Sequence, residues 1–128
     1  MAKEFINPST IHDTGGRYTH IVKSGNTVFI AGQIGLDVAG NLVGEGDIEA
    51  QTRQVLVNLE AAVQAAGGKK EDIMCINTYI LTRDDLPGLR KALQGFFDPT
   101  PANTLLIVSG LARPELLVEI EAKAIVGE

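Results

Sequence analysis

The strand-like stretch from Val118 to Ala124 constrains the fold of this chain more than any other segment. Its apolar residues recur at every second position: Val118, Ile120, Ala122 and Ala124. Its charged residues occupy the positions between them: Glu119, Glu121 and Lys123. Because side chains alternate across a strand, one side must join a hydrophobic core and the other presents two carboxylates. If that second side is covered, the pKa of a desolvated carboxylate rises, and either Glu119 or Glu121 becomes a candidate proton-handling group.

Hydrophobic patterning predicts a single α+β domain over residues 1–128. One helix should begin after Asp47 and end before Gly67, and a second should begin after Asp84 or Asp85 and carry an apolar stripe as far as Phe97. Strands are expected over residues 3–6, 18–23, 27–34 and 72–81, with two more within 101–124. The order is β-β-β-α-β-α-β-β. In the first helix, Gln51 and Arg53 are expected outside the apolar stripe.

Two helices can cover only one face of such a mixed sheet, although several strands are apolar on both sides. In the stretch 27–34, Val28 and Ile30 alternate with Phe29 and Ala31. Strands of this kind need cover on each face. We therefore expect a homo-oligomer whose helix-free sheet faces turn inward, the alternative being a monomer with shorter strands.

Composition argues against several functional classes. The net charge of −5 and the absence of Trp do not favour a nucleic-acid surface, and no apolar run approaches the roughly 20 residues that span a bilayer. A lone cysteine, Cys75, permits no intramolecular disulfide, and the chain shows no signal-peptide pattern, so a cytoplasmic location is expected. No metal-binding or phosphate-binding motif is present, and no metal or cofactor is predicted.

A glycine-flexed loop carries a second set of candidates. Arg17 and Tyr18 follow Gly15 and Gly16, and an Arg–Tyr pair placed there can clamp a carboxylate or hold a small molecule. The residues alone equally describe a surface arginine beside a half-buried tyrosine.

Several stretches, in their order and spacing, resemble the RidA (YjgF/YER057c-like) family along essentially the whole chain. The matching segments are Gly16-Arg17-Tyr18, the VFIAGQI run at 28–34, the QTRQVLVNL run at 51–59 and the VEIEA run at 118–122. This resemblance implies a chorismate-mutase-like fold and a homotrimer whose sheets line a central barrel. It also implies three small-molecule clefts at the subunit interfaces.

The resemblance further implies hydrolysis of enamines or imines to 2-keto acids and ammonia, without a metal or organic cofactor. By the same resemblance Glu119 is the catalytic residue that positions water or moves a proton, and Tyr18, Ala31 and Gly32 line the cleft. The family arginine that holds the substrate carboxylate is replaced by Asn103, and the cleft asparagine of the second helix by Arg90.

The missing arginine shapes the expected activity. Asn103 donates hydrogen bonds but carries no charge. A substrate other than the usual 2-aminoacrylate is therefore expected, with Arg17 or Arg90 as the replacement cation. The alternative is a catalytically silent relative that binds a metabolite or a protein. A ribonuclease, an older description of such proteins, is disfavoured by the acidic balance and the few aromatic residues.

Overall fold

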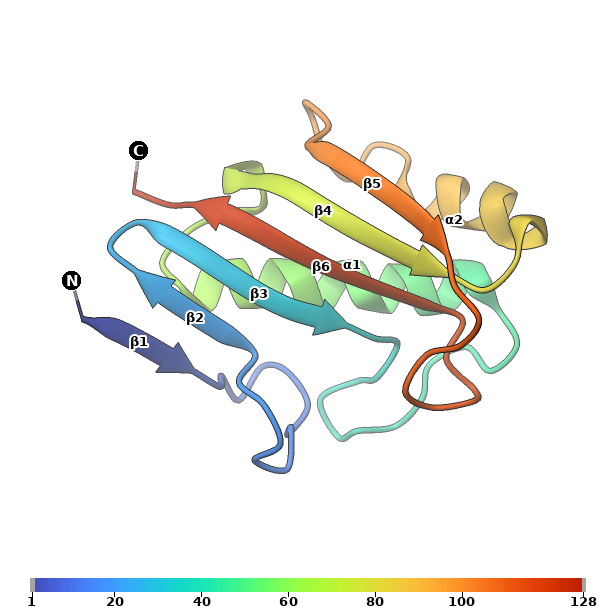
Figure 1. Cartoon of the computed structure of the whole chain (residues 1–128), viewed down its shortest axis with the longest axis horizontal. Helices are drawn as coiled ribbons and strands as arrows, with labels where there is room; N and C mark the ends of the chain where they lie inside the picture. The colour runs from blue at the N-terminus through green and yellow to red at the C-terminus, as the bar shows by residue number, and fades with distance from the viewer. Residues whose placement is uncertain (1, 128) are drawn as a thin grey trace.

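The computed structural model describes residues 2–127, which form one six-stranded sheet and two helices (Figure 1). The strands are β1 (Lys3–Ile6), β2 (Ile21–Ser24), β3 (Thr27–Gln33), β4 (Ile73–Ile80), β5 (Ala102–Ile107) and β6 (Val118–Ile125). The helices are α1 (Ile48–Ala65) and α2 (Leu86–Leu93), with short 3-10 turns at Lys70–Asp72 and Arg83–Asp85. The strand order is β1-β2-β3-β6-β4-β5, and every pair is antiparallel except β4–β5. The predicted element order is confirmed.

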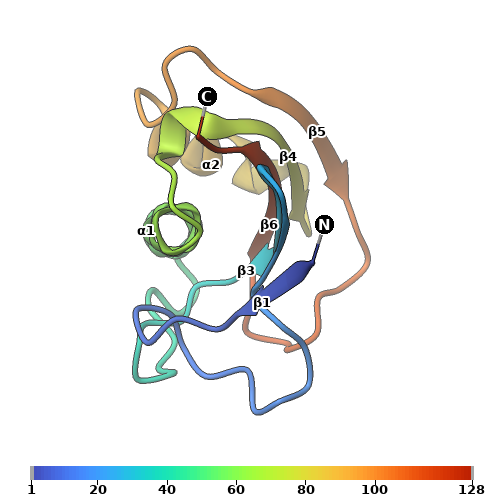
Figure 2. The same cartoon turned by 90° about the vertical axis from the view of Figure 1, so that its left-hand side faces the viewer.

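Both helices lie on one face of a curved sheet, and the opposite face carries no helix (Figure 2). The alternating apolar residues of β6 are all buried in the core between sheet and helices, as the pattern predicted. Glu119 and Glu121 are half-buried on the other side of the same strand. The α+β prediction is therefore confirmed. Within residues 2–127, no helix combines the length and apolar character needed to cross a membrane.

Three predicted boundaries differ from the structure. Strand β2 begins at Ile21 rather than residue 18, because the His20 N–H donates to the Asn7 side chain at 2.8 Å instead of extending the ladder. Strand β3 ends at Gln33 rather than residue 34, and a register shift between Ile30 and Gln33 places the Gln33 side chain in the core. Helix α2 ends at Leu93, before the two phenylalanines, although these still pack on the core.

The prediction for Gln51 is wrong, because this residue is fully buried. Its Nε2 donates to the carbonyls of Gly44 and Glu115 at 3.1 and 3.0 Å, and its Oε1 accepts from the Leu117 N–H at 2.9 Å. Two turns of α1 further on, Asn58 Nδ2 donates to two carbonyls of the 34–36 segment at 3.0 Å. Helix α1 therefore holds two connecting loops by buried amide groups.

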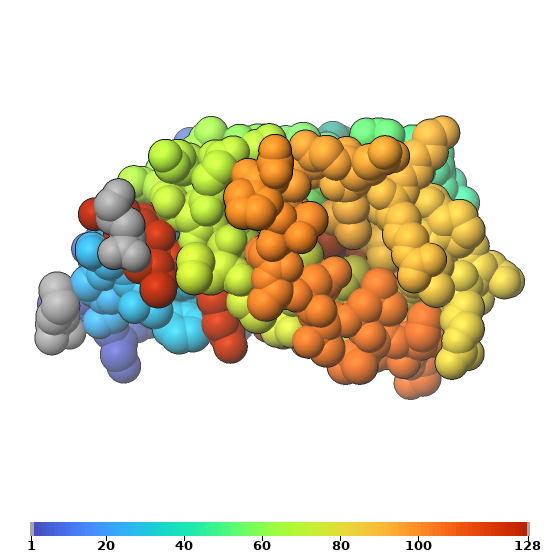
Figure 3. All heavy atoms as spheres, turned by 90° about the horizontal axis from the view of Figure 1, so that it is seen from above, coloured from blue at the N-terminus to red at the C-terminus, as the bar shows by residue number. Residues whose placement is uncertain are grey.

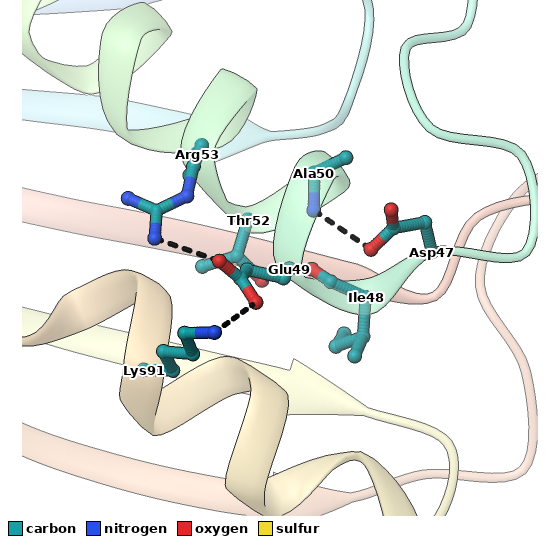
Figure 4. Close-up of polar contacts among 7 residues, drawn as sticks. All are labelled: Asp47, Ile48, Glu49, Ala50, Thr52, Arg53 and Lys91. Atoms are coloured by element: carbon teal, nitrogen blue, oxygen red, sulfur yellow. Dashed lines mark hydrogen bonds and ion pairs between the residues drawn. The ribbon is translucent and has the colours of Figure 1, made fainter.

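The start of α1 follows its sequence signals. Asp47 caps the helix by accepting from the Ala50 N–H at 3.1 Å. Glu49 then pairs with Arg53 at 2.8 Å and with Lys91 of α2 at 3.6 Å (Figure 4). These ion pairs lie at the surface, where such contacts contribute less than about 1 kcal/mol each.

We expect Gln51→Ala to lower the free energy of unfolding by about 2–4 kcal/mol, because it removes a fully buried side chain and its three hydrogen bonds to part-buried backbone groups. Gln64→Ala is the matched control: the same substitution at an exposed position of the same helix should change stability by no more than about 0.5 kcal/mol. Urea unfolding followed by circular dichroism measures both. Equal effects of the two substitutions would contradict the role given to Gln51.

Candidate active site

Three loops gather at the end of the sheet where β3 ends and β6 begins (Figure 1). They are the β1–β2 loop (residues 7–20), the segment 34–47 before α1, and the β5–β6 loop (residues 108–117). Together with β3 and β6 they enclose a cleft of about 620 Å³. Its walls are His12, Asp13, Thr14, Arg17, Tyr18, Ala31, Gly32, Ile34, Leu36, Ala112, Arg113, Leu116 and Glu119.

The carboxylate of Glu119 lies directly against the backbone of Gly32. A Cβ atom added at Gly32 would overlap Oε2, Cδ and Cγ of Glu119. Glycine is therefore required at this position because a side chain would not fit. The backbone conformation does not demand glycine, because the φ angle of Gly32 lies outside the left-handed region. The neighbouring strands β3 and β6 thus place the Glu119 carboxylate beside the Gly32 backbone inside the cleft.

Burial raises the pKa of Glu119 above its ordinary value, and the nearby charge of Glu121 raises this pKa further. Glu121 does not line the same cleft. It accepts from the hydroxyl of Tyr79 at 2.5 Å and from Nδ2 of Asn77 at 3.2 Å, which leaves it engaged on the helix-free face. Of the two glutamates that the strand pattern left open, only Glu119 faces this cleft. A carboxyl group with a raised pKa can release and take back a proton near neutral pH.

The ring of the loop residue Tyr18 packs against the ring of His20. The two rings meet edge to face, with centroids 5.6 Å apart. His20 is buried; its Nε2 donates to the His12 carbonyl at 2.8 Å, and its Nδ1 accepts from Nε2 of Gln33 at 3.1 Å. Strand β3 therefore anchors the loop that carries Tyr18. Burial and the charge of Glu119 raise the pKa of Tyr18, so its hydroxyl keeps its proton.

The structure brings five predicted site residues into one cleft and leaves two outside it. Those inside are Arg17, Tyr18, Ala31, Gly32 and Glu119. Arg90 lies on α2, in a separate shallow hollow with Lys91 and Thr100. Asn103 lies on β5 opposite Ile76 of β4, and its side chain accepts from the Thr78 hydroxyl at 3.1 Å. In the view from above, β5 and the segment before it run along the surface beside α2 (Figure 3).

Arg113 and His12 are among the lining residues that sequence reasoning missed. Each lies in a loop whose path only the folded chain defines. The position of Arg113 shortly before the Glu119 strand was the one available signal. Among residues 2–127, no three His, Cys, Asp or Glu side chains gather closely enough to hold a metal ion.

Comparison with known proteins agrees with this architecture. Residues 10–126 match the model of a family described as Endoribonuclease L-PSP, the family also known as YjgF or RidA. The chain belongs to the RidA family. One RidA-family relative, a RutC family protein of Pyrococcus horikoshii, is 37% identical over 123 residues, covering 95% of this chain and 97% of its own.

Two further RidA-family similarities concern named proteins. A 2-iminobutanoate/2-iminopropanoate deaminase of Dermatophagoides farinae is 34% identical over 112 residues, covering 87% of each chain. The crystal structure of E. coli TdcF with bound serine superposes with a TM-score of 0.88 at 28% identity, covering 97% of this chain and 99% of that one. The expectation of a RidA-family fold is confirmed.

We expect Glu121→Gln to lower the pKa of Glu119, because it removes the negative charge that disfavours ionisation of its neighbour. The pKa should still remain above the ordinary value for a glutamate, since burial is the larger cause and persists. A ¹³C NMR titration of the Glu119 carboxyl carbon measures the change. Glu60→Gln on α1 is the control and should leave the titration where it was; a Glu119 pKa unchanged in Glu121→Gln would refute the coupling.

Proposed function

We propose that this protein is a deaminase that hydrolyses a small enamine or imine to a 2-keto acid and ammonia. The observation that carries the proposal is the carboxylate of Glu119 held against Gly32 inside the cleft. Similarity to the 2-iminobutanoate/2-iminopropanoate deaminase supports the reaction class. Similarity to TdcF with bound serine supports a small ligand that carries a carboxylate.

The reaction requires only water and proton transfers. An enamine first takes a proton on carbon and loses one from nitrogen, which converts it to the imine. Water then adds to the imine carbon and gives up a proton, while the nitrogen gains one. The resulting carbinolamine expels ammonia and forms the keto group. Glu119, with its raised pKa, takes the proton from the attacking water and returns it to the departing nitrogen. Tyr18 presents a protonated hydroxyl beside it.

The anion-binding part of this site differs from the usual family pattern. Asn103 stands where relatives place an arginine, and in this chain it lies outside the cleft that holds Glu119. A cation already in the cleft, Arg17, is a candidate to hold the carboxylate of the substrate. We therefore propose a substrate other than 2-aminoacrylate.

We also propose that three copies assemble through their helix-free sheet faces. That face exposes large apolar side chains from four strands: Phe5, Phe29, Leu106 and Ile125. Exposed apolar surface of this extent on one face favours association. In such an assembly a neighbouring copy would supply Asn103 or Arg90 to the rim of each cleft.

A second candidate function is metabolite binding without turnover. The uncharged Asn103 favours it, because a site that has lost its family cation binds and orients a carboxylate less strongly. The two functions differ in whether the bound ligand is consumed.

We expect the wild-type protein to accelerate the loss of imino acids that an L-amino-acid oxidase generates in the presence of catalase. Semicarbazide trapping measures the remaining imino acid, and ammonia release measures its hydrolysis. Glu119→Gln should reduce kcat/KM by about 100-fold or more, because it removes proton transfer. Glu121→Gln is the control: it should retain activity, with the acid limb of its pH profile moved to lower pH. Thermal stabilisation by 2-keto acids without any turnover would instead establish the binding function.

For the assembly, we expect sedimentation to give a mass about three times the 13.6 kDa of one chain. Leu106→Glu should yield monomers, because it places a charge on the proposed contact face. Val57→Glu, an equally exposed apolar position on α1, should leave the trimer intact. Monomeric wild type would contradict the proposal.

A further inference from the structure

The site described above leaves two charged lining residues, Asp13 and Arg113, without a role. Arg113 lies in the β5–β6 loop and lines the same cleft as Glu119. Its guanidinium contacts the carboxylate of Glu115 two residues along the chain. We propose that Arg113 and His12 form the anion subsite of this cleft, which Glu115 occupies until the carboxylate of a small 2-imino or 2-keto acid displaces it; this inference rests on the proposed function.

The Arg113 guanidinium is not paired with Glu115 in its strongest hydrogen-bonding arrangement. Both Nε and Nη2 of Arg113 contact a single oxygen, Oε1 of Glu115, at 2.5 Å. A free ligand carboxylate can instead offer two oxygens to the guanidinium fork, which is the stronger arrangement. Both side chains are partly exposed, so a ligand can reach them.

The backbone beneath this pair is held in place. The Leu116 N–H donates to the Arg113 carbonyl at 3.2 Å and closes a turn. Gln51 donates to the Glu115 carbonyl and accepts from the Leu117 N–H, at 3.0 and 2.9 Å. The guanidinium therefore projects from a fixed turn, and exchange of Glu115 for a ligand requires only side-chain movement.

A second observation, the buried and unpartnered ring of His12, distinguishes the Arg113–Glu115 pair from an ordinary surface ion pair. His12 lines the same cleft, is only 4% exposed, and neither of its ring nitrogens has a hydrogen-bond partner within residues 2–127. Its own backbone is fixed, because its carbonyl accepts from His20. A buried imidazole without partners is unfavourable, and a ligand oxygen would satisfy its N–H.

The electrostatics of His12 fit this role. Burial, and then the charges of His20 and Arg113, lower the pKa of His12 and outweigh the nearby Asp13 carboxylate, so the ring is neutral at physiological pH. A neutral ring has one N–H to donate. His12 and Arg113 line the same cleft, where the proposed anion would contact both groups.

The Glu49–Arg53 pair on α1 provides an internal comparison. It has similar chemistry and a contact of 2.8 Å, but it lies near Lys91 on the surface, outside the cleft that holds Glu119 (Figure 4). It therefore supplies matched control substitutions for both members of the Arg113–Glu115 pair.

The test is calorimetric titration of the assembled protein with 2-ketobutanoate, a keto acid that is not consumed by hydrolysis. Arg113→Gln should raise Kd about 10-fold or more, and Arg113→Lys should recover part of the affinity, since it keeps the charge but not the fork. Glu115→Gln should lower Kd about 3-fold, because it removes the competing carboxylate. Arg53→Gln and Glu49→Gln should leave Kd unchanged, and thermal unfolding should confirm that each variant is folded.

Three results would overturn the inference: no binding of 2-ketobutanoate to the wild type, a Kd that rises with Arg17→Gln and not with Arg113→Gln, or weaker binding in folded Glu115→Gln. His12→Phe provides an independent measurement and should also raise Kd. The outcome is separable from the proposed function. Binding through Arg113 without imine turnover would retain the subsite and reject the deaminase, whereas turnover that Arg113→Gln leaves unchanged would do the opposite.

Discussion

The cleft depends above all on one buried amide. Gln51 extends from α1 and bonds to both the 34–47 segment and the β5–β6 loop. Asn58, on the same helix, bonds to the carbonyls of Ile34 and Leu36. Buried polar groups must find partners, so these loops cannot move away from α1 without leaving several donors and acceptors unsatisfied. Two of the cleft walls are therefore fixed by polar contacts inside an otherwise apolar layer, rather than by the hydrophobic packing that holds the helix on the sheet.

The chemistry of the cleft comes from the sheet. The irregular register of β3 between Ile30 and Gln33 places Gly32 beside Glu119, and the missing side chain leaves space for a carboxylate. The same irregularity turns Gln33 inward, where it holds His20 and thereby the loop that carries Tyr18. A single local distortion of one strand therefore positions both the acidic group and its aromatic neighbour. This agrees with the tendency of β-bulges to occur where a strand must redirect side chains near a functional site.

The charge distribution in the cleft is unusual for an acidic chain. The protein carries a net charge of −5, yet Arg17 and Arg113 both line the cleft. Together with a glutamate whose pKa is raised, they give a site suited to an anion that also needs proton transfer. The two cleft arginines come from different loops, Arg17 from the β1–β2 loop and Arg113 from the β5–β6 loop. The position of a cation in a cleft limits the size and orientation of the carboxylate-bearing molecules that it can hold.

The sequence by itself determined the element order, the apolar face of β6 and the family. These follow from short-range periodicity and from motifs that lie within single segments, which folding does not rearrange. The family resemblance pointed to Glu119, but only the tertiary structure decided that Gln51 is buried and showed that Glu119, and not Glu121, lines the cleft. It also showed that Arg113 and His12 line the cleft, while Arg90 and Asn103 do not lie with Glu119 in one chain. The reason is physical: a polar residue on a helix or in a loop has no periodic signature, and its neighbours are set by contacts between segments far apart in the chain.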